Sequence, residues 1–185
     1  YLRCKRKAWL DFQGDKSQKN WSPHSSIQSI TENYTFEKFT KGELGFGLKS
    51  CEKGIKGVLG LKIKRKFKTN LETEIFPPLL VKTEGQSKWG NYKYIPAVSK
   101  LGRRTTKEHF LNLALCSINL EIFQESAIQY GLVISNFKNK LHYEKVKLNE
   151  KLRRKAINIF SELIDSLSGE IPRINKDRKK CSICE

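Results

Sequence analysis

The chain has 185 residues, of which 38% are hydrophobic and 30% are charged, and this balance argues against both a disordered chain and a membrane protein. No apolar run approaches the roughly 18 residues of a membrane-spanning helix, and no signal peptide pattern opens the chain, so we expect a cytoplasmic protein without a membrane partner. Lysine and arginine total 36 against 19 aspartates and glutamates, so the formal net charge is +17. A polyanion is then the default partner; the alternative is a lysine-rich composition set by an AT-rich genome.

Cysteines lie near both ends of the chain, with Cys4 in a basic opening segment and Cys181 and Cys184 in a Cys-x-x-Cys pair. Five cysteines, an odd number, fit an intracellular metal or redox site better than a disulfide framework. Folding would have to bring the two ends together for the three thiolates to share one metal centre. Zinc is one alternative occupant, and an unligated tail is another.

The limits of the sequence suggest a longer product. The chain contains no Met and stops one residue after Cys184, so we expect a fragment truncated at both ends, with a fourth cysteine beyond Glu185. We expect residues 1–185 to form a single domain, since this length is ordinary for one hydrophobic core.

The first predicted helix covers residues 27–39, after a polar loop, and Gly42 ends it. Its inward residues are expected to be Ile27, Ile30, Tyr34 and Phe36.

Strands are predicted at residues 55–63, 79–82 and 92–100, with residues 85–91 forming a hairpin connection between the second and the third. Gly57 and Gly60 indicate a bulge or a close backbone approach in the first of these strands. Within it and just beyond it, lysines recur at every second position, at Lys62, Lys64, Lys66 and Lys68. In a strand they would line one face and could track phosphates, whereas the alternative is the solvated face of an edge strand.

The second half of the chain alternates helices and strands. Thr105 and Glu108 have the spacing of a capping box for a buried helix that runs to about residue 123. Strands follow at 128–135 and 141–148, and Asn149 caps a last helix whose expected inner stripe is Leu152, Ala156, Ile159, Phe160, Leu163 and Leu167, with Gly169 as its end. This order predicts a mixed α/β or α+β domain.

Other residues of chemical interest are interpreted as structural. We expect Cys116 to behave as a small apolar residue in the buried helix, and Cys51 to lie in a loop without a partner. His109 and His142 lack an accompanying nucleophile or acid. Trp89 is expected to be a partly buried anchor, although such a ring could also stack on an exposed base.

Three segments, together with both cysteine sites, resemble the RecB-like nucleases of the PD-(D/E)XK superfamily. The segments are Pro77 to Lys82 (PPLLVK), Gly85 to Pro96 (GQSKWGNYKYIP) and Lys100 to Arg104 (KLGRR). The resemblance covers nearly the whole chain and is closest to the iron–sulfur members, which include CRISPR-associated exonucleases. It implies a restriction-endonuclease-like core with a mixed central sheet flanked by helices, DNA as the substrate, a role in DNA repair, and a [4Fe–4S] cluster on Cys4, Cys181, Cys184 and a fourth ligand.

The chain departs from this family at the catalytic positions. Family members bind Mg²⁺ or Mn²⁺ through a carboxylate on one strand and an acid two residues before a lysine on the next. Here these positions hold Pro78 and Val98, and only the lysine, Lys100, remains. The upstream helix lacks the family's His, and Phe110 stands where a Gln is usual.

The sequence therefore predicts a nuclease-fold domain that binds DNA, or serves as a scaffold, without hydrolysing it. The alternative is an active divalent-metal-dependent DNA exonuclease with relocated carboxylates. Lys100 is expected to contact phosphate or to be a solvated strand terminus. Arg103 and Arg104 could clamp phosphates or be ordinary loop charges. A fused or associated helicase or nuclease domain is the expected protein partner.

Overall fold

The computed structural model describes residues 4–15, 17, 23–67, 71–102 and 104–173. The helices are α1 (Lys5–Gln13), α2 (Pro23–Thr40), α3 (Gly47–Glu52), α4 (Lys107–Gln124) and α5 (Glu150–Leu167). The strands are β1 (Leu44–Phe46), β2 (Gly57–Leu59), β3 (Ile63–Phe67), β4 (Leu71–Ile75), β5 (Leu79–Ser87), β6 (Gly90–Ser99), β7 (Tyr130–Phe137) and β8 (Lys140–Lys147).

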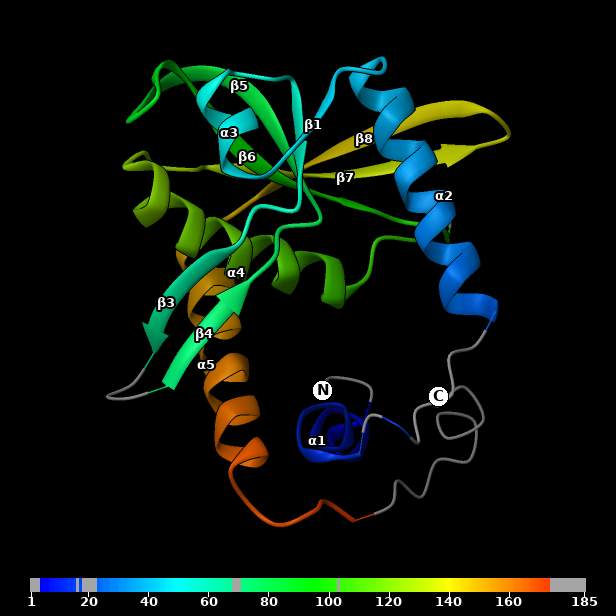
Figure 1. The fold of residues 1–185 in the computed structure, drawn as a ribbon, viewed down its shortest axis with the longest axis vertical. Helices are drawn as coiled ribbons and strands as arrows, with labels where there is room; N and C mark the ends of the chain where they lie inside the picture. Colours follow the sequence, from blue (N-terminus) through cyan, green and yellow to red (C-terminus); the bar gives the residue numbers. More distant parts are fainter. Residues whose placement is uncertain (1–3, 16, 18–22, 68–70, 103, 174–185) are drawn as a thin grey trace.

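A mixed six-stranded sheet forms the centre of the molecule, with the strand order β1-β2-β5-β6-β7-β8 and helices around it (Figure 1). β5 and β6 pair as an antiparallel hairpin, β6 and β7 pair in parallel, and β7 and β8 form a second hairpin. Strands β3 and β4 form a separate two-stranded ribbon. The predicted mixed α/β class, with a central sheet flanked by helices, is confirmed.

Helices α2 and α4 pack on opposite faces of the β6–β8 part of the sheet. The Phe39 ring of α2 meets the Tyr143 ring of β8 edge-on, with centroids 5.9 Å apart. On the other face, the Leu113 side chain of α4 approaches Gly131 of β7 so closely that a Cβ there would lie 2.9 Å from it. Because side chains alternate along a strand, the residues that share a face with Gly131 lie on the α4 side.

Several predicted elements appear with small changes in their ends. The expected hairpin spans β5 and β6, the buried helix is α4, and the Asn149 side chain accepts the Leu152 backbone N–H as the cap of α5. The turn between β7 and β8 is made by Lys138 and Asn139, both with positive φ, a conformation for which Asn is well suited.

Two local predictions are wrong. Residues 55–63 do not form one strand, because Gly60 takes a φ of +65° and the chain leaves the sheet after β2 to enter the ribbon. The helix cap lies one residue later than expected, at Thr106, whose backbone N–H donates to the His109 imidazole. Thr105 is thereby left available for a different contact, which is described below.

The inward face of α2 also differs from the prediction. Ile27, Ile30 and Tyr34 are 62%, 69% and 51% exposed, while Phe36 is buried. The helix meets the sheet through its C-terminal half, and its N-terminal half extends past the strands (Figure 1). Thr35 and Thr40 can be buried there because their hydroxyls donate to carbonyls one turn earlier in the helix.

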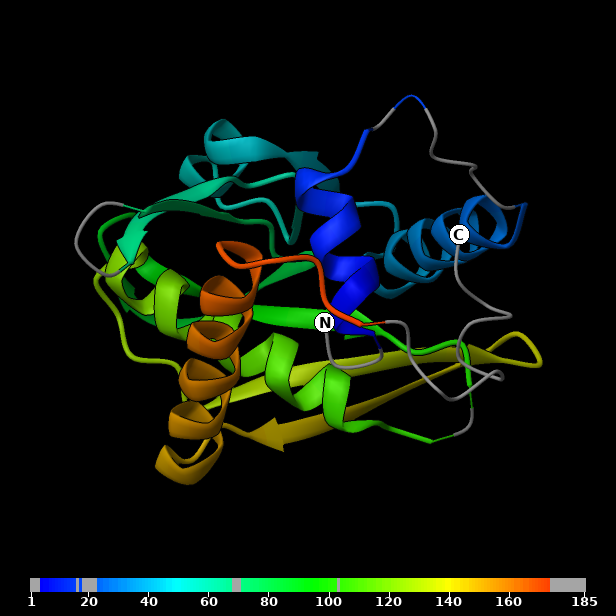
Figure 2. The same ribbon diagram turned by 90° about the horizontal axis from the view of Figure 1, so that it is seen from below.

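Helix α1 was not predicted, and it joins the two ends of the described chain. Arg6 donates to the Pro172 carbonyl, Trp9 to the Gly169 carbonyl, and Gln13 to the Leu167 carbonyl, all at or beyond the end of α5. Figure 2 shows the helix alongside the segment that follows α5. Across the described residues, every helix is too short or too polar to cross a bilayer.

Candidate functional site

A row of side chains crosses the sheet where the family resemblance expects metal-binding acids. Val98 of β6 pairs with Val133 of β7, and Val133 pairs with Glu144 of β8. Val133 shares the face of Gly131, so all three side chains lie on the α4 side. Pro78 immediately precedes β5, whose first residue pairs with Ala97, and it therefore borders the same row.

Val98 is 4% exposed and apolar, so this part of the row offers no oxygen ligand. Glu144 is the carboxylate of the row, two strands away from Val98. Among the residues that the structure describes, no group of three or more His, Cys, Asp or Glu side chains is arranged to hold a metal ion.

Lys100 follows directly after β6 and is held at both ends. Its backbone N–H donates to the Ile134 carbonyl at 2.8 Å, and its Nζ donates to the Thr105 hydroxyl at 3.1 Å. The same Nζ lies 3.9 Å from Glu144 Oε2, and the Lys100 side chain is only 15% exposed. The prediction that Lys100 is a solvated strand terminus is therefore wrong, because its ammonium contacts Thr105 and Glu144 and is largely shielded from water.

The Thr105 hydroxyl completes this arrangement by donating to Glu144 Oε2 at 2.8 Å. Lys100, Thr105 and Glu144 thus form a chain of contacts that joins the end of β6, the loop before α4 and β8. Sequence reasoning missed Glu144 because it is 44 positions from Lys100, and only the pairing through β7 brings them together.

The predicted lysine row lies on the ribbon, opposite a row of glutamates. Lys64 pairs with Glu74 and Lys66 with Glu72 across β3 and β4. Lys64 Nζ is 3.2 Å from Glu74 Oε1, and this hydrogen bond, followed by the charges of Glu72 and Glu74, raises the pKa of Lys64. The two lysines do share one face, as expected, but the carboxylates beside them reduce the positive field of the row.

Lys62 precedes β3 and lies over the Phe76 ring, 5.6 Å from its centroid. Arg104 is exposed in the loop between β6 and α4. Arg103 and Lys68 lie outside the described residues.

Of the three cysteines expected to hold a cluster, the structure describes Cys4 alone; Cys181 and Cys184 fall outside the described residues. Cys4 is the N-cap of α1, and its thiol accepts the Lys7 backbone N–H at 3.4 Å. Two residues later, Arg6 binds the Pro172 carbonyl at 3.0 Å. Cys181 follows Pro172 by nine positions, and an extended chain of that length spans about 30 Å, so the sequence is long enough to return to Cys4.

The other two cysteines are poor ligands in this fold. Cys51 lies in α3, not in a loop, and is fully buried. Burial, with a smaller contribution from Glu52, raises the pKa of Cys51 to about 12. Burial likewise raises the pKa of Cys116 to about 12, and its thiol contacts Asn112 Oδ1 at 3.1 Å.

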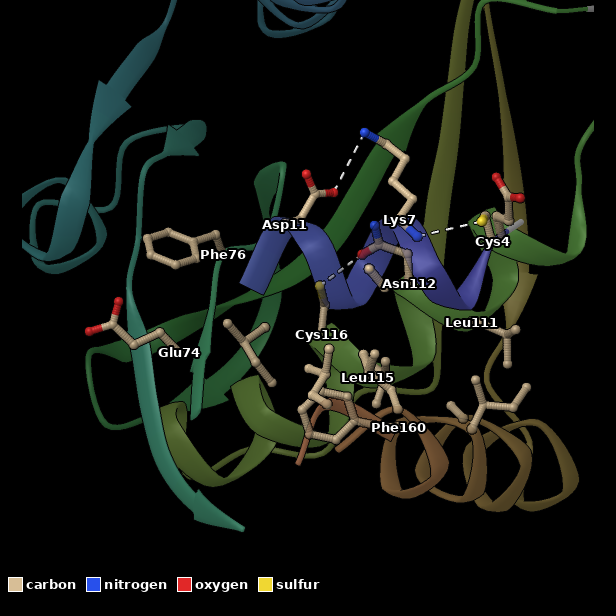
Figure 3. Close-up of a pocket in the computed structure, with 17 residues that line it drawn as sticks. Cys4, Lys7, Asp11, Glu74, Phe76, Leu111, Asn112, Leu115, Cys116 and Phe160 are labelled. Carbon is tan, nitrogen blue, oxygen red and sulfur yellow. Dashed lines mark hydrogen bonds and ion pairs between the residues drawn. The ribbon is translucent and has the colours of Figure 1, made fainter. Parts of the chain in front are cut away.

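A cavity of about 670 Å³ lies beneath α1, between α4, α5 and the end of β4 (Figure 3). Leucine, isoleucine, phenylalanine and alanine side chains form most of its wall, and Cys4, Lys7, Asp11, Glu74 and Glu108 add polar groups. No residue of α1 is buried, so the helix covers the groove between α4 and α5 without filling it. Because α1 itself was not predicted, this cavity could not be predicted from the sequence either.

Among the solved structures to which this chain is similar is the crystal structure of SSO0001. The two folds match with a TM-score of 0.55 and 10% sequence identity, over 98% of this chain and 78% of that chain. At this identity the likeness shows the fold alone. No protein-family model matches the sequence, and no curated protein matches it.

Proposed function

We propose that this chain is a nuclease-fold domain of the RecB-like, PD-(D/E)XK type that binds DNA without cleaving it. The observation that carries the proposal is the pair of positions at the end of β6. Val98, where a metal ligand is required, is apolar and 4% exposed, while Lys100, on the same side of the strand, keeps a cation at the strand end. Hydrolysis in this superfamily needs a metal ion to activate water and neutralise phosphate charge, whereas binding needs only cations.

The charge of the chain supports a polyanionic ligand. The net charge of +17 favours binding to a phosphate backbone, because each contact between a basic side chain and a phosphate releases counterions. Such contacts do not depend on the base sequence. Exposed Arg104 lies four residues after Lys100, so the loop before α4 offers a guanidinium close in sequence to the β6 cation. Lys62, Lys64 and Lys66 are further candidate DNA contacts, on and just before β3. Arg103 is proposed as another, and it lies outside the described residues.

The test compares binding and cleavage in one series. Labelled single-stranded and double-stranded DNA are incubated with the wild-type chain and with Lys100→Ala, in Mg²⁺, in Mn²⁺ and in chelator. We expect a salt-sensitive mobility shift without cleavage in every condition. Metal-dependent cleavage that disappears in Lys100→Ala would show an active nuclease, and the absence of any shift would mean that the charge reflects composition alone.

An active enzyme with relocated carboxylates is the second candidate, and Glu144 is the observation that favours it. Its carboxylate lies on the α4 face in the row of Val98 and reaches Lys100. If Glu144 held the catalytic metal, cleavage would be lost in Glu144→Gln as well as in Lys100→Ala. The same gel series therefore separates the two candidates.

We also propose that Cys4, Cys181 and Cys184 supply three ligands of a [4Fe–4S] cluster, with a fourth ligand from outside residues 1–185. The contact of Arg6 with Pro172 supports this, because it holds the α1 end of the chain against the segment that leads toward Cys181. Such a cluster would fasten the two ends of the domain. Cys4→Ala should lower the iron and sulfide content and the melting temperature, whereas Cys116→Ala should leave the iron content unchanged.

A further inference from the structure

We propose that Lys100 and Thr105 form a phosphate-binding subsite that Glu144 covers when DNA is absent. The inference rests on the proposed DNA binding and adds a residue pair and a regulatory contact that the sequence did not indicate. It follows from the chain of contacts in which Lys100 Nζ donates to Thr105 Oγ1 at 3.1 Å and Thr105 Oγ1 donates to Glu144 Oε2 at 2.8 Å.

The Glu144 carboxylate lies where a phosphate oxygen would bind. An anionic oxygen at this place accepts the Thr105 hydroxyl proton and lies 3.9 Å from the Lys100 ammonium. Phosphate oxygens are acceptors of the same kind, and an ammonium with a hydroxyl is a common pair of phosphate donors. A bound phosphate would therefore replace one acceptor with another and leave both donors paired.

The exposures of the Lys100 and Glu144 side chains make the exchange feasible. Lys100 is 15% exposed, so the protein holds its ammonium near one position. Glu144 is 51% exposed, on the edge strand β8, and can turn away into water at small cost. An ion pair at 3.9 Å with one partner open to solvent is weak, so DNA can displace the Glu144 carboxylate.

Covering the subsite has a physical reason. Without a partner, the largely buried ammonium of Lys100 would pay a desolvation cost, and Glu144 offsets part of it. The Glu144 carboxylate also repels an approaching phosphate, so it lowers the affinity of the Lys100–Thr105 subsite for isolated anions. DNA that contacts the exposed Arg104 at the same time can overcome this repulsion, since neighbouring contacts raise the effective phosphate concentration.

The test measures DNA affinity by fluorescence anisotropy over a series of KCl concentrations, using a labelled duplex and a labelled single strand. For Glu144→Gln we expect binding roughly 2- to 10-fold tighter at low salt. The plot of log affinity against log salt should also become steeper, by about 0.9 for the duplex and about 0.7 for the single strand, which corresponds to one more phosphate contact. Adding Thr105→Val or Lys100→Gln to Glu144→Gln should return both values toward those of the wild type.

Glu150→Gln is the matched control. It removes the same charge and also frees a cation, Arg154, which lies 2.8 Å from Glu150 on the exposed surface of α5. Equal tightening in Glu150→Gln and Glu144→Gln would overturn the inference, because net charge alone would explain it. Tighter binding without a steeper salt dependence would overturn it as well.

The outcomes for the subsite and for the proposed function are distinct. Wild-type binding that Glu144→Gln leaves unchanged contradicts the covered subsite and keeps the DNA-binding function. No binding by the wild type or by any variant contradicts the function, and the subsite with it. Binding by Glu144→Gln where the wild type binds weakly or not at all supports the cover directly. A thermal melt of each variant confirms that the compared proteins are folded.

Discussion

Two ion pairs in this molecule each join a basic side chain to a glutamate, yet they differ in solvent exposure and in hydrogen bonding. At the junction of α4 and α5, Arg153 binds Glu121 through two hydrogen bonds, at 2.6 and 2.8 Å, with side chains 16% and 23% exposed. On the ribbon, Lys64 contacts Glu74 at 3.2 Å with side chains 59% and 39% exposed. The contrast indicates that an ion pair matters for the stability of this fold where it is enclosed and fully hydrogen-bonded. It contributes little where water competes for the charged groups.

The junction pair also belongs to a wider network. Arg153 Nε donates to the Leu148 carbonyl at 2.9 Å, and Glu121 Oε1 accepts the Ile128 backbone N–H at 2.6 Å. One ion pair therefore holds the end of α4, the segment before β7 and the first turn of α5. The pair of Lys100 and Glu144 is intermediate, with one partner enclosed and the other open to solvent.

The largest predicted effect comes from breaking the enclosed pair. Arg153→Ala should lower the free energy of unfolding by about 3–5 kcal/mol, because it leaves the Glu121 carboxylate partly buried without its cation. Urea unfolding followed by circular dichroism measures the change. Arg154→Ala is the control on the same helix, since Arg154 and Glu150 are 75% and 68% exposed and such a pair contributes about 0.5 kcal/mol or less. Similar losses in both variants would contradict the contrast.

Burial of other ionisable groups sets the second prediction, a loss of stability at alkaline pH. Burial of the thiol raises the pKa of Cys116 to about 12 from its ordinary value of 9.0. Above pH 9 the unfolded chain loses this proton while the folded chain keeps it, so the free energy of unfolding falls as pH rises. The contribution is present in full below pH 9 and is lost up to about pH 12, at no more than about 1.4 kcal/mol per pH unit.

Urea unfolding at several pH values between 9 and 12 measures this slope. Burial raises the pKa of Cys51 and of Tyr94 too, so the wild-type slope contains more than one group. Cys116→Ala isolates one of them, and we expect its stability to fall less steeply with pH than that of the wild type. Parallel slopes for the two proteins would show that the Cys116 thiol titrates normally in the folded state.

The sequence could predict the parts of the fold that rest on local signals. Alternating apolar residues and turn-forming pairs located both hairpins, and the apolar circumference of residues 107–124 located the buried helix. Asn149 was found as a cap because its role depends on residues three positions away. These features needed no knowledge of the tertiary structure.

The remaining features depend on partners that are distant in the chain. Helix α1 donates hydrogen bonds to carbonyls at or beyond the end of α5, more than 150 positions away. Its own sequence has no apolar stripe from which a helix could be predicted. Ile27 and Ile30 have helical spacing, yet they are exposed because the sheet ends before it reaches them. Glu144 meets Lys100 through the register of two strand pairs, which composition and spacing do not determine.

The smallest predicted effect is on the ribbon. Lys64→Gln should leave the urea midpoint of unfolding unchanged within error, because the ion pair that it removes is largely open to solvent. Its effect on DNA binding should also be small, since Lys64 and Lys66 each pair with a glutamate across the ribbon, and the charge of that carboxylate opposes the approach of a phosphate. We therefore expect Lys64→Gln together with Lys66→Gln to reduce the salt slope of DNA binding by less than the loss of two phosphate contacts, about 1.8.

Glu72→Gln with Glu74→Gln supplies the reverse test, and it should tighten binding only if the freed lysines reach DNA. A full loss of about 1.8 in the lysine variant would show that the ribbon is a phosphate track despite its glutamates, and that an exposed ion pair can be exchanged as readily as the half-enclosed pair of Lys100 and Glu144.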